Sequence, residues 1–179
     1  MTHVILDEIY NDNIDNVIYL CIKYPKILGV RYNDMNLLVY ASMCGSISCL
    51  KYLSKYFNVN LDTSNNYSPL MYASKYMHID CMKYLIENGA DVTYIDDAGC
   101  NILMRLITTQ HSLKKYNCYN NKYNSKKYTL LNCVKYLIPY SDIKYVSPNT
   151  GYNVLIWSMF CKMHECTELL IPHSENIAI

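Results

Sequence analysis

The stretch that decides the fold is "CMKYLIENGADV", residues 81–92, because its opening letters recur along the chain. Cys-x-Lys-Tyr-Leu is found again as "CLKYL" from Cys49 and as "CVKYL" from Cys133, and "CTELL" follows from Cys166. A cysteine that recurs in one local context is either a metal or redox ligand or one structural position written several times. The spacing of the copies distinguishes between these two interpretations.

A second recurring segment accompanies the cysteine segments and gives the period. It reads "NLLVYAS" from residue 36, "SPLMYAS" from 68, "NILMRLI" from 101 and "NVLIWSM" from 153. Its leucines are separated by 32, 33 and 52 residues and the four cysteines by 32, 52 and 33, so both series have a period near 33. Such a period indicates a repeat protein. Because the long interval comes at different steps in the two series, an insertion is expected at about 108–128.

Local signals predict two helices in each unit. Ser68, or the asparagine that replaces it in the other units, can cap a first helix, and Pro69 suits the first helical position. Apolar residues spaced by three and four in 79–86 predict the buried face of a second helix. Gly89 then suits the left-handed conformation that ends a helix. Pro172 is expected to cut the last helix short.

These signals together resemble the ankyrin repeat, and the best match is "NYSPLMYASKYMHIDCMKYLIENGADVT", residues 66–93. The resemblance implies an all-α ankyrin-repeat solenoid of about five helix-turn-helix units with short β-turn fingers, forming a single domain over 1–179. It also places His78 where the ankyrin histidine braces neighbouring repeats. The expected units are 4–30, 34–60, 66–93, 99–141 (which contains the insertion 108–128) and 151–171.

The bulk composition excludes several classes of protein. The chain has 179 residues, of which 51% are hydrophobic, and a net charge of +1, so no strong attraction to nucleic acid or to an acidic membrane surface is expected. The acidic N-terminal stretch does not look like a secretory signal, so we expect a cytoplasmic protein with reduced cysteines and no membrane association. Its tyrosine-rich and asparagine-rich composition resembles ankyrin-repeat proteins of large AT-rich DNA viruses, which implies a host protein as partner.

The recurring cysteines are interpreted as packing residues. Cys49, Cys81, Cys133 and Cys166 fall where the ankyrin pattern has an aliphatic residue, and a buried cysteine behaves as a small hydrophobe. A zinc site needs convergent ligands, and neither "CKMHEC" nor His78 with Cys81 has an obvious complement. The sequence has no motif of a hydrolase, nucleotide-binding loop or metalloprotease. We therefore expect no enzyme activity, no metal and no cofactor.

The insertion is rich in lysine and tyrosine, which leaves two interpretations open. Lysines can contact phosphates and tyrosines can stack on bases, so the insertion could bind single-stranded nucleic acid. The simpler interpretation, which we favour, is an exposed, mobile loop over 109–127. The residues that would bind nucleic acid are Lys114, Lys115, Lys126, Lys127, Tyr116 and Tyr119.

Candidate partner-binding residues come from the register of the first helices. Tyr, Trp and Arg dominate binding hot spots, and stacked units would align several of them into a stripe on the concave face and the turn tips. The alternative is that these side chains are partly buried between repeats. The sequence thus predicts a monomeric protein–protein interaction module with an unidentified protein partner. The candidate residues are Tyr40, Tyr72, Arg105, Trp157, Tyr67, Tyr152 and Tyr76.

Overall fold

The computed structural model describes residues 2–60, 67–115 and 129–174. Within them the regular secondary structure is helical, apart from an isolated bridge between Tyr32 and Met35, and turns join the helices. Two short 3-10 helices, Pro25–Gly29 and Ile138–Tyr140, follow second helices. The α-helices are α1 (Thr2–Tyr10), α2 (Ile14–Lys23), α3 (Leu37–Cys44), α4 (Ile47–Leu53), α5 (Pro69–Lys75), α6 (Ile79–Glu87), α7 (Ile102–Lys115), α8 (Leu130–Leu137), α9 (Val154–Phe160) and α10 (His164–Ser174).

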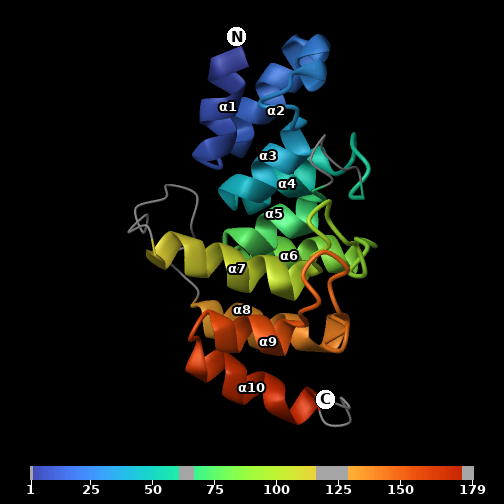
Figure 1. Cartoon of the computed structure of the whole chain (residues 1–179). Helices are drawn as coiled ribbons and strands as arrows, with labels where there is room; N and C mark the ends of the chain where they lie inside the picture. The colour runs from blue at the N-terminus through green and yellow to red at the C-terminus, as the bar shows by residue number, and fades with distance from the viewer. Residues whose placement is uncertain (1, 61–66, 116–128, 175–179) are drawn as a thin grey trace.

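The helices form a stack of pairs that runs from the N-terminus at the top to the C-terminus at the bottom of Figure 1. Consecutive helices pair as α1 with α2, α3 with α4, and so on to α9 with α10. The first helices also pack on one another in the order α1, α3, α5, α7 and α9. The chain segments that join successive pairs lie on one side of the stack, at the right in Figure 1. This arrangement confirms the predicted all-α solenoid.

Each first helix from α3 onward begins at the residue that the sequence predicted. The cap side chain accepts a hydrogen bond from the backbone N–H three residues on, at 2.9 Å for Asn36, 3.2 Å for Ser68, 3.0 Å for Asn101 and 2.9 Å for Asn153. Such a cap contributes about 1 kcal/mol to helix stability. Gly89, just beyond α6, has φ +85°, so the predicted left-handed helix end is confirmed as well.

The turn inside each regular pair passes through one residue with a positive φ. Asp12, Gly45, Met77 and Lys162 hold this place, with φ of 53°, 77°, 63° and 54°. Only one of them is glycine, although a left-handed conformation costs other residues about 1–2 kcal/mol. Packing of the helices on either side therefore outweighs the local backbone preference at the other three turns.

His78 braces neighbouring pairs, as the resemblance implied. Its Nε2 donates a hydrogen bond to the backbone carbonyl of Met43, 3.1 Å away, at the end of α3. The imidazole ring lies against Gly45, where an added Cβ would meet Nδ1 at 2.3 Å. Glycine is thus required at residue 45 both by its φ and by the ring above it.

Asp12 makes a contact between pairs that the sequence analysis missed. Its carboxylate accepts hydrogen bonds from the backbone N–H groups of Ser48, at 3.2 Å, and Cys49, at 2.9 Å, in the first turn of α4. Ser46 completes the contact by donating from its hydroxyl to the carbonyl of Ile9. The open N–H groups of one pair are therefore satisfied by the preceding pair.

Two boundary predictions were wrong. The segment 109–115 belongs to α7 and is not a loop, because neither glycine nor proline interrupts the helix. The hydroxyls of Thr108 and Ser112 donate to carbonyls of the preceding turn. Gln110 also donates from Nε2 to the carbonyl of Lys75 at 3.0 Å. The last helix continues through Pro172 to Ser174, since a proline so near the end removes only one helix bond. The rest of the expected loop, 116–127, lies outside the described residues.

Replacing Gly45 by alanine is expected to destabilise the protein by about 2–4 kcal/mol, because left-handed strain and the clash with His78 add together. Gly89→Ala is the matched control: it has a similar φ but open space around it, so about 1 kcal/mol is expected. Urea unfolding of both variants gives the comparison. Equal losses would show that the His78 contact contributes nothing to stability.

Candidate functional site

The recurring cysteines are packing residues, as predicted. Cys49, Cys81, Cys133 and Cys166 are all buried on second helices. Burial raises the pKa of both Cys81 and Cys133 to about 12, although for Cys81 nearby carboxylates such as Asp12 also contribute, and it raises that of Cys166 to about 11. Thiols in this state are neutral and poor nucleophiles at neutral pH.

The described residues do not bring metal-binding side chains together. Within 2–60, 67–115 and 129–174 there is no group of three or more histidine, cysteine, aspartate or glutamate side chains that could hold an ion. His78, one of the candidates, has its Nε2 bonded to a backbone carbonyl. The local pairs of cysteine and histidine seen in the sequence therefore have no complement in this part of the chain.

The aromatic stripe residues are fixed by other aromatic rings near their own helix starts. Tyr40 packs on Tyr32 with ring centroids 5.2 Å apart, and Tyr72 packs on Tyr67 at 5.3 Å. Trp157 packs on Tyr152 in the same way, at 5.5 Å. Tyr40, Tyr72 and Tyr76 are buried, whereas Tyr67 and Trp157 are half-buried and Tyr152 is exposed. The structure thus divides the predicted stripe between the two interpretations.

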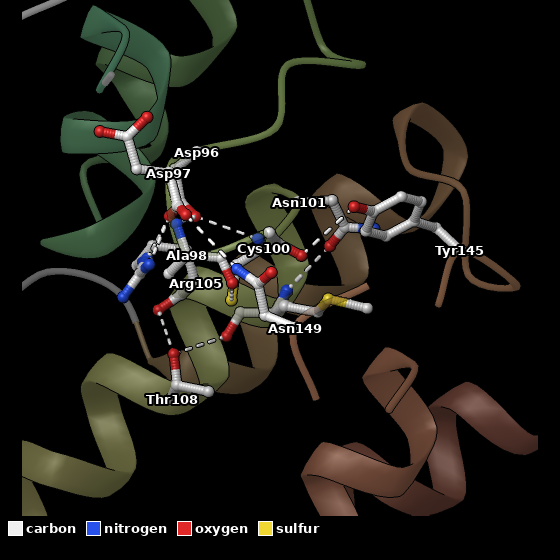
Figure 2. Close-up of polar contacts among 11 residues, drawn as sticks. Asp96, Asp97, Ala98, Cys100, Asn101, Arg105, Thr108, Tyr145 and Asn149 are labelled. Carbon is white, nitrogen blue, oxygen red and sulfur yellow. Dashed lines mark hydrogen bonds and ion pairs between the residues drawn. The ribbon is translucent and has the colours of Figure 1, made fainter. Parts of the chain in front are cut away.

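Arg105 stands where the other units have an aromatic residue, and Asp96 holds it in place (Figure 2). Arg105 reaches Asp96 Oδ2 with Nε at 2.6 Å and with Nη2 at 2.5 Å. The other oxygen of Asp96 accepts from the backbone N–H groups of Ala98 and Cys100, both at 3.0 Å. The carboxylate is fully buried, while 19% of the Arg105 side chain remains exposed. Asp96 was not singled out in the sequence, since only the fold brings it to Arg105.

The finger that contains Asp96, residues 96–100, is also tied to the next finger. Asn101 donates from Nδ2 to the carbonyl of Asp142 at 3.0 Å. The hydroxyl of Tyr145 donates to the carbonyl of Gly99 at 3.3 Å (Figure 2). These bonds cross from one unit to the next and satisfy polar backbone groups that the turns leave open. The position of Arg105 is therefore set by rigid neighbours.

Lys75 and Arg105 form a cationic cluster on tyrosine rings. The Lys75 Nζ lies 5.4 Å from the ring centroid of Tyr67, 5.9 Å from that of Tyr72 and 5.3 Å from that of Tyr76. The Arg105 guanidinium lies 5.1 Å from the Tyr67 centroid, so Tyr67 is in contact with both cations. Contacts of this kind contribute about 0.5–2 kcal/mol each. We call these five residues the tyrosine–cation cluster.

The electrostatics of the tyrosine–cation cluster favour an anion. Burial, and then the neighbouring Arg105, lower the pKa of Lys75, while burial raises that of Tyr67. The Arg105–Asp96 contact is the one ion pair found within the described residues, so Lys75 has no carboxylate partner there. In the cluster, Asp96 neutralises Arg105, whereas Lys75 keeps its charge, and both cations lie on aromatic rings. This combination suits a ligand that has a carboxylate next to an apolar group.

The nucleic-acid candidates are mostly beyond what the structure describes. Lys114 and Lys115 lie at the end of α7, and nothing is described of their side chains. Tyr116, Tyr119, Lys126 and Lys127 lie outside the described residues. The hypothesis that the insertion binds single-stranded nucleic acid stays a prediction.

An apolar surface on α9 was not predicted from the sequence. The exposed fractions are 40% for Ile156, 61% for Met159 and 64% for Phe160. α9 carries no charged residue that would make this surface polar. Phe160 packs edge-on against Trp157, whose buried Nε1 has no hydrogen-bond partner among the described residues. The residues that match Ile156 and Met159 in earlier units are buried. The apolar residues at these two places of α9 were therefore the sequence signal that could have drawn attention to this surface.

Comparison with known families agrees with the geometry. The family model described as ankyrin repeats (3 copies) matches residues 7–96, which is half of the chain, and the chain belongs to this family. Ankyrin repeats are generally protein–protein interaction modules and are typically not enzymes. A search of curated proteins found no match to the chain. Among the described residues, no helix has the length and apolar character needed to cross a lipid bilayer.

Cys81→Ser is expected to lower the free energy of unfolding by about 1–3 kcal/mol, because it buries a hydroxyl that lacks a full set of partners. Cys44→Ser, at a half-exposed cysteine, should cost less than about 0.5 kcal/mol. Thermal melting of both variants, with and without added Zn²⁺, tests the packing interpretation. Melting that depends on zinc would contradict it.

The raised thiol pKa values predict alkaline destabilisation. Cys81 and Cys133 titrate near pH 12 in the folded protein and near about 8.5 when unfolded, so their neutral form stabilises the fold below pH ~8.5 and this contribution is lost as pH rises towards 12. Unfolding free energies between about pH 8 and 9.5 should fall, and Cys133→Ala should reduce the slope by about 1 kcal/mol per pH unit. An unchanged slope would show that Cys133 is not buried as a thiol.

Proposed function

We propose that the chain binds a protein partner through the surface formed by its first helices and fingers, with an acidic segment of the partner at the tyrosine–cation cluster. The observation that carries this proposal is the Lys75 ammonium, held over tyrosine rings without a carboxylate of its own within the described residues. The resemblance to viral ankyrin proteins adds the proposal that the partner is a cellular protein of a host.

The side chains of the tyrosine–cation cluster are preorganised for binding. Asp96 fixes Arg105, and the rings of Tyr67 and Tyr76 limit the freedom of Lys75. Little side-chain entropy is then lost on binding, which leaves more of the contact energy as affinity. Because Lys75 is partly desolvated, an incoming carboxylate interacts with it more strongly than with a lysine surrounded by water.

The test compares Lys75→Met with Lys135→Met in capture of proteins from a host-cell lysate. Methionine keeps an apolar stem but removes the charge, and Lys135 is an exposed lysine on α8, away from the tyrosine–cation cluster. We expect a protein that survives nuclease treatment, is retained by Lys135→Met and binds Lys75→Met with about fivefold to thirtyfold lower affinity. Melting curves check that both variants remain folded.

Two outcomes would contradict the proposal. Equal affinity of the two variants for the captured protein would show that Lys75 does not contact it. Loss of all capture after nuclease treatment would favour the nucleic-acid hypothesis instead, and titration of a labelled single-stranded oligonucleotide at two salt concentrations would then measure it.

A further inference from the structure

Arg105 takes part in the tyrosine–cation cluster with some of its hydrogen-bonding capacity already used. Its guanidinium has five N–H donors in a fixed planar fork, which can bind two oxygens of a carboxylate or a phosphate at once. Nε and Nη2, along one side of this fork, both reach Asp96 Oδ2, at 2.6 and 2.5 Å (Figure 2). A ligand therefore meets Arg105 through the donors that remain, on Nη1 and on the outer side of Nη2.

Asp96 is held so firmly that an arriving ligand does not displace it. Its Oδ1 accepts hydrogen bonds from the backbone N–H groups of Ala98 and Cys100, and its side chain is fully buried. Separating this buried carboxylate from Arg105 would leave a charge without a partner, which is strongly unfavourable. Asp96 therefore remains part of the site when a ligand is bound.

The fixed carboxylate sets the charge that the cluster presents to a ligand. Lys75 and Arg105 are each positive and Asp96 is negative, so together they present a single positive charge. The tyrosine rings around Lys75 add the negative faces of their π-systems. A ligand with one negative charge balances the cluster. A second negative charge on the ligand would be repelled by Asp96, and this repulsion is stronger in a half-buried site than in water.

Carboxylates and phosphate monoesters differ in this second charge. The side chains of aspartate and glutamate carry one negative charge at neutral pH, whereas a phosphorylated serine, threonine or tyrosine carries about 1.5 to 2. Proteins that recognise phosphorylated segments usually do so with clusters of arginines. The tyrosine–cation cluster contains one arginine, and one side of its fork is closed by Asp96.

We propose that Asp96 makes the tyrosine–cation cluster selective for a carboxylate over a phosphate monoester. The partner segment is then recognised through an unmodified aspartate or glutamate next to an apolar group, and a phosphorylated residue at the same place is rejected. This inference rests on the proposed function, because it concerns the ligand of the same site. Asp96 thus determines specificity in addition to fixing the position of Arg105.

Three small anions, each with an aromatic ring next to its charged group, test this selectivity. They are phenylacetate, phenyl phosphate and methyl phenyl phosphate, and the methyl ester has lost the second charge of phenyl phosphate. NMR titration of the isotope-labelled full chain, at neutral pH and constant ionic strength, follows the backbone N–H signals of Ala98 and Cys100, which contact Asp96. We expect the Kd of phenyl phosphate to be about tenfold higher than that of phenylacetate. Methyl phenyl phosphate should bind more tightly than phenyl phosphate.

Asp96→Asn tests the cause of the selectivity. Asparagine keeps an oxygen for the N–H groups of Ala98 and Cys100 but removes the negative charge. We expect the preference for phenylacetate over phenyl phosphate to fall about fivefold or more. Asp97→Asn is the matched control, because Asp97 is exposed and its carboxylate forms no ion pair with Arg105. It should change the preference by about twofold at most.

Equal Kd values of phenylacetate and phenyl phosphate for the unchanged protein would overturn the role of Asp96. The proposed function would survive that result if Lys75→Met weakened the binding of both anions. Equal effects of Asp96→Asn and Asp97→Asn would also overturn the role of Asp96, because surface charge in general would then explain the preference.

A comparison within the unchanged protein decides the matter if Asp96→Asn does not fold. Equal binding of phenyl phosphate and its methyl ester would then overturn the inference, since the second charge would have no effect. Failure of all three anions to bind would contradict the inference and the proposed function together. Binding of phenylacetate that Lys75→Met leaves unchanged would do the same, because the anion would then lie outside the tyrosine–cation cluster.

Discussion

The packing of one first helix on the next is the contact on which the rest of the structure depends. A pair of short helices cannot bury its apolar side alone, and stacking supplies the missing cover. Small residues on the stacked faces, such as Ala41 and Ala73, are completely buried and allow the helices to approach closely. The second helices then close the outer side, where the recurring cysteines fill the space between neighbours. Apolar burial in this protein is therefore a property of neighbouring pairs and not of any single pair.

Polar groups, like apolar ones, are satisfied by contacts between neighbouring pairs. Asp12 satisfies N–H groups of α4, and His78 bonds to the end of α3, so helix ends are completed by the adjacent pair. The tyrosine–cation cluster has this character as well, because Arg105 of α7 lies over Tyr67, which precedes α5. Stability and the proposed binding surface thus arise at the same boundaries between units.

The sequence was sufficient for features set by local spacing. Helix caps such as Asn36, the helix end at Gly89 and the burial of Cys81 each follow from a short pattern, and each is confirmed. The extension of α7 to Lys115 could not be predicted, since the segment lacks both a helix breaker and a strong helix signal. Burial of Tyr40 depends on a ring eight residues earlier, Tyr32, whose direction only the fold determines.

The length of α7 also has a consequence for the order in which the protein folds. In the third pair α5 ends at Lys75 and α6 begins at Ile79, whereas α7 ends at Lys115 and α8 does not begin until Leu130. Closing a longer stretch of chain costs more entropy, so contacts between α7 and α8 form more slowly than those within the other pairs. α7 packs on α5 on one side and on α8 and α9 on the other, so it lies at the seam between the helices that precede it and the block from α8 to α10. We expect folding to nucleate on both sides of this seam. Docking of the two blocks of helices then completes the native state.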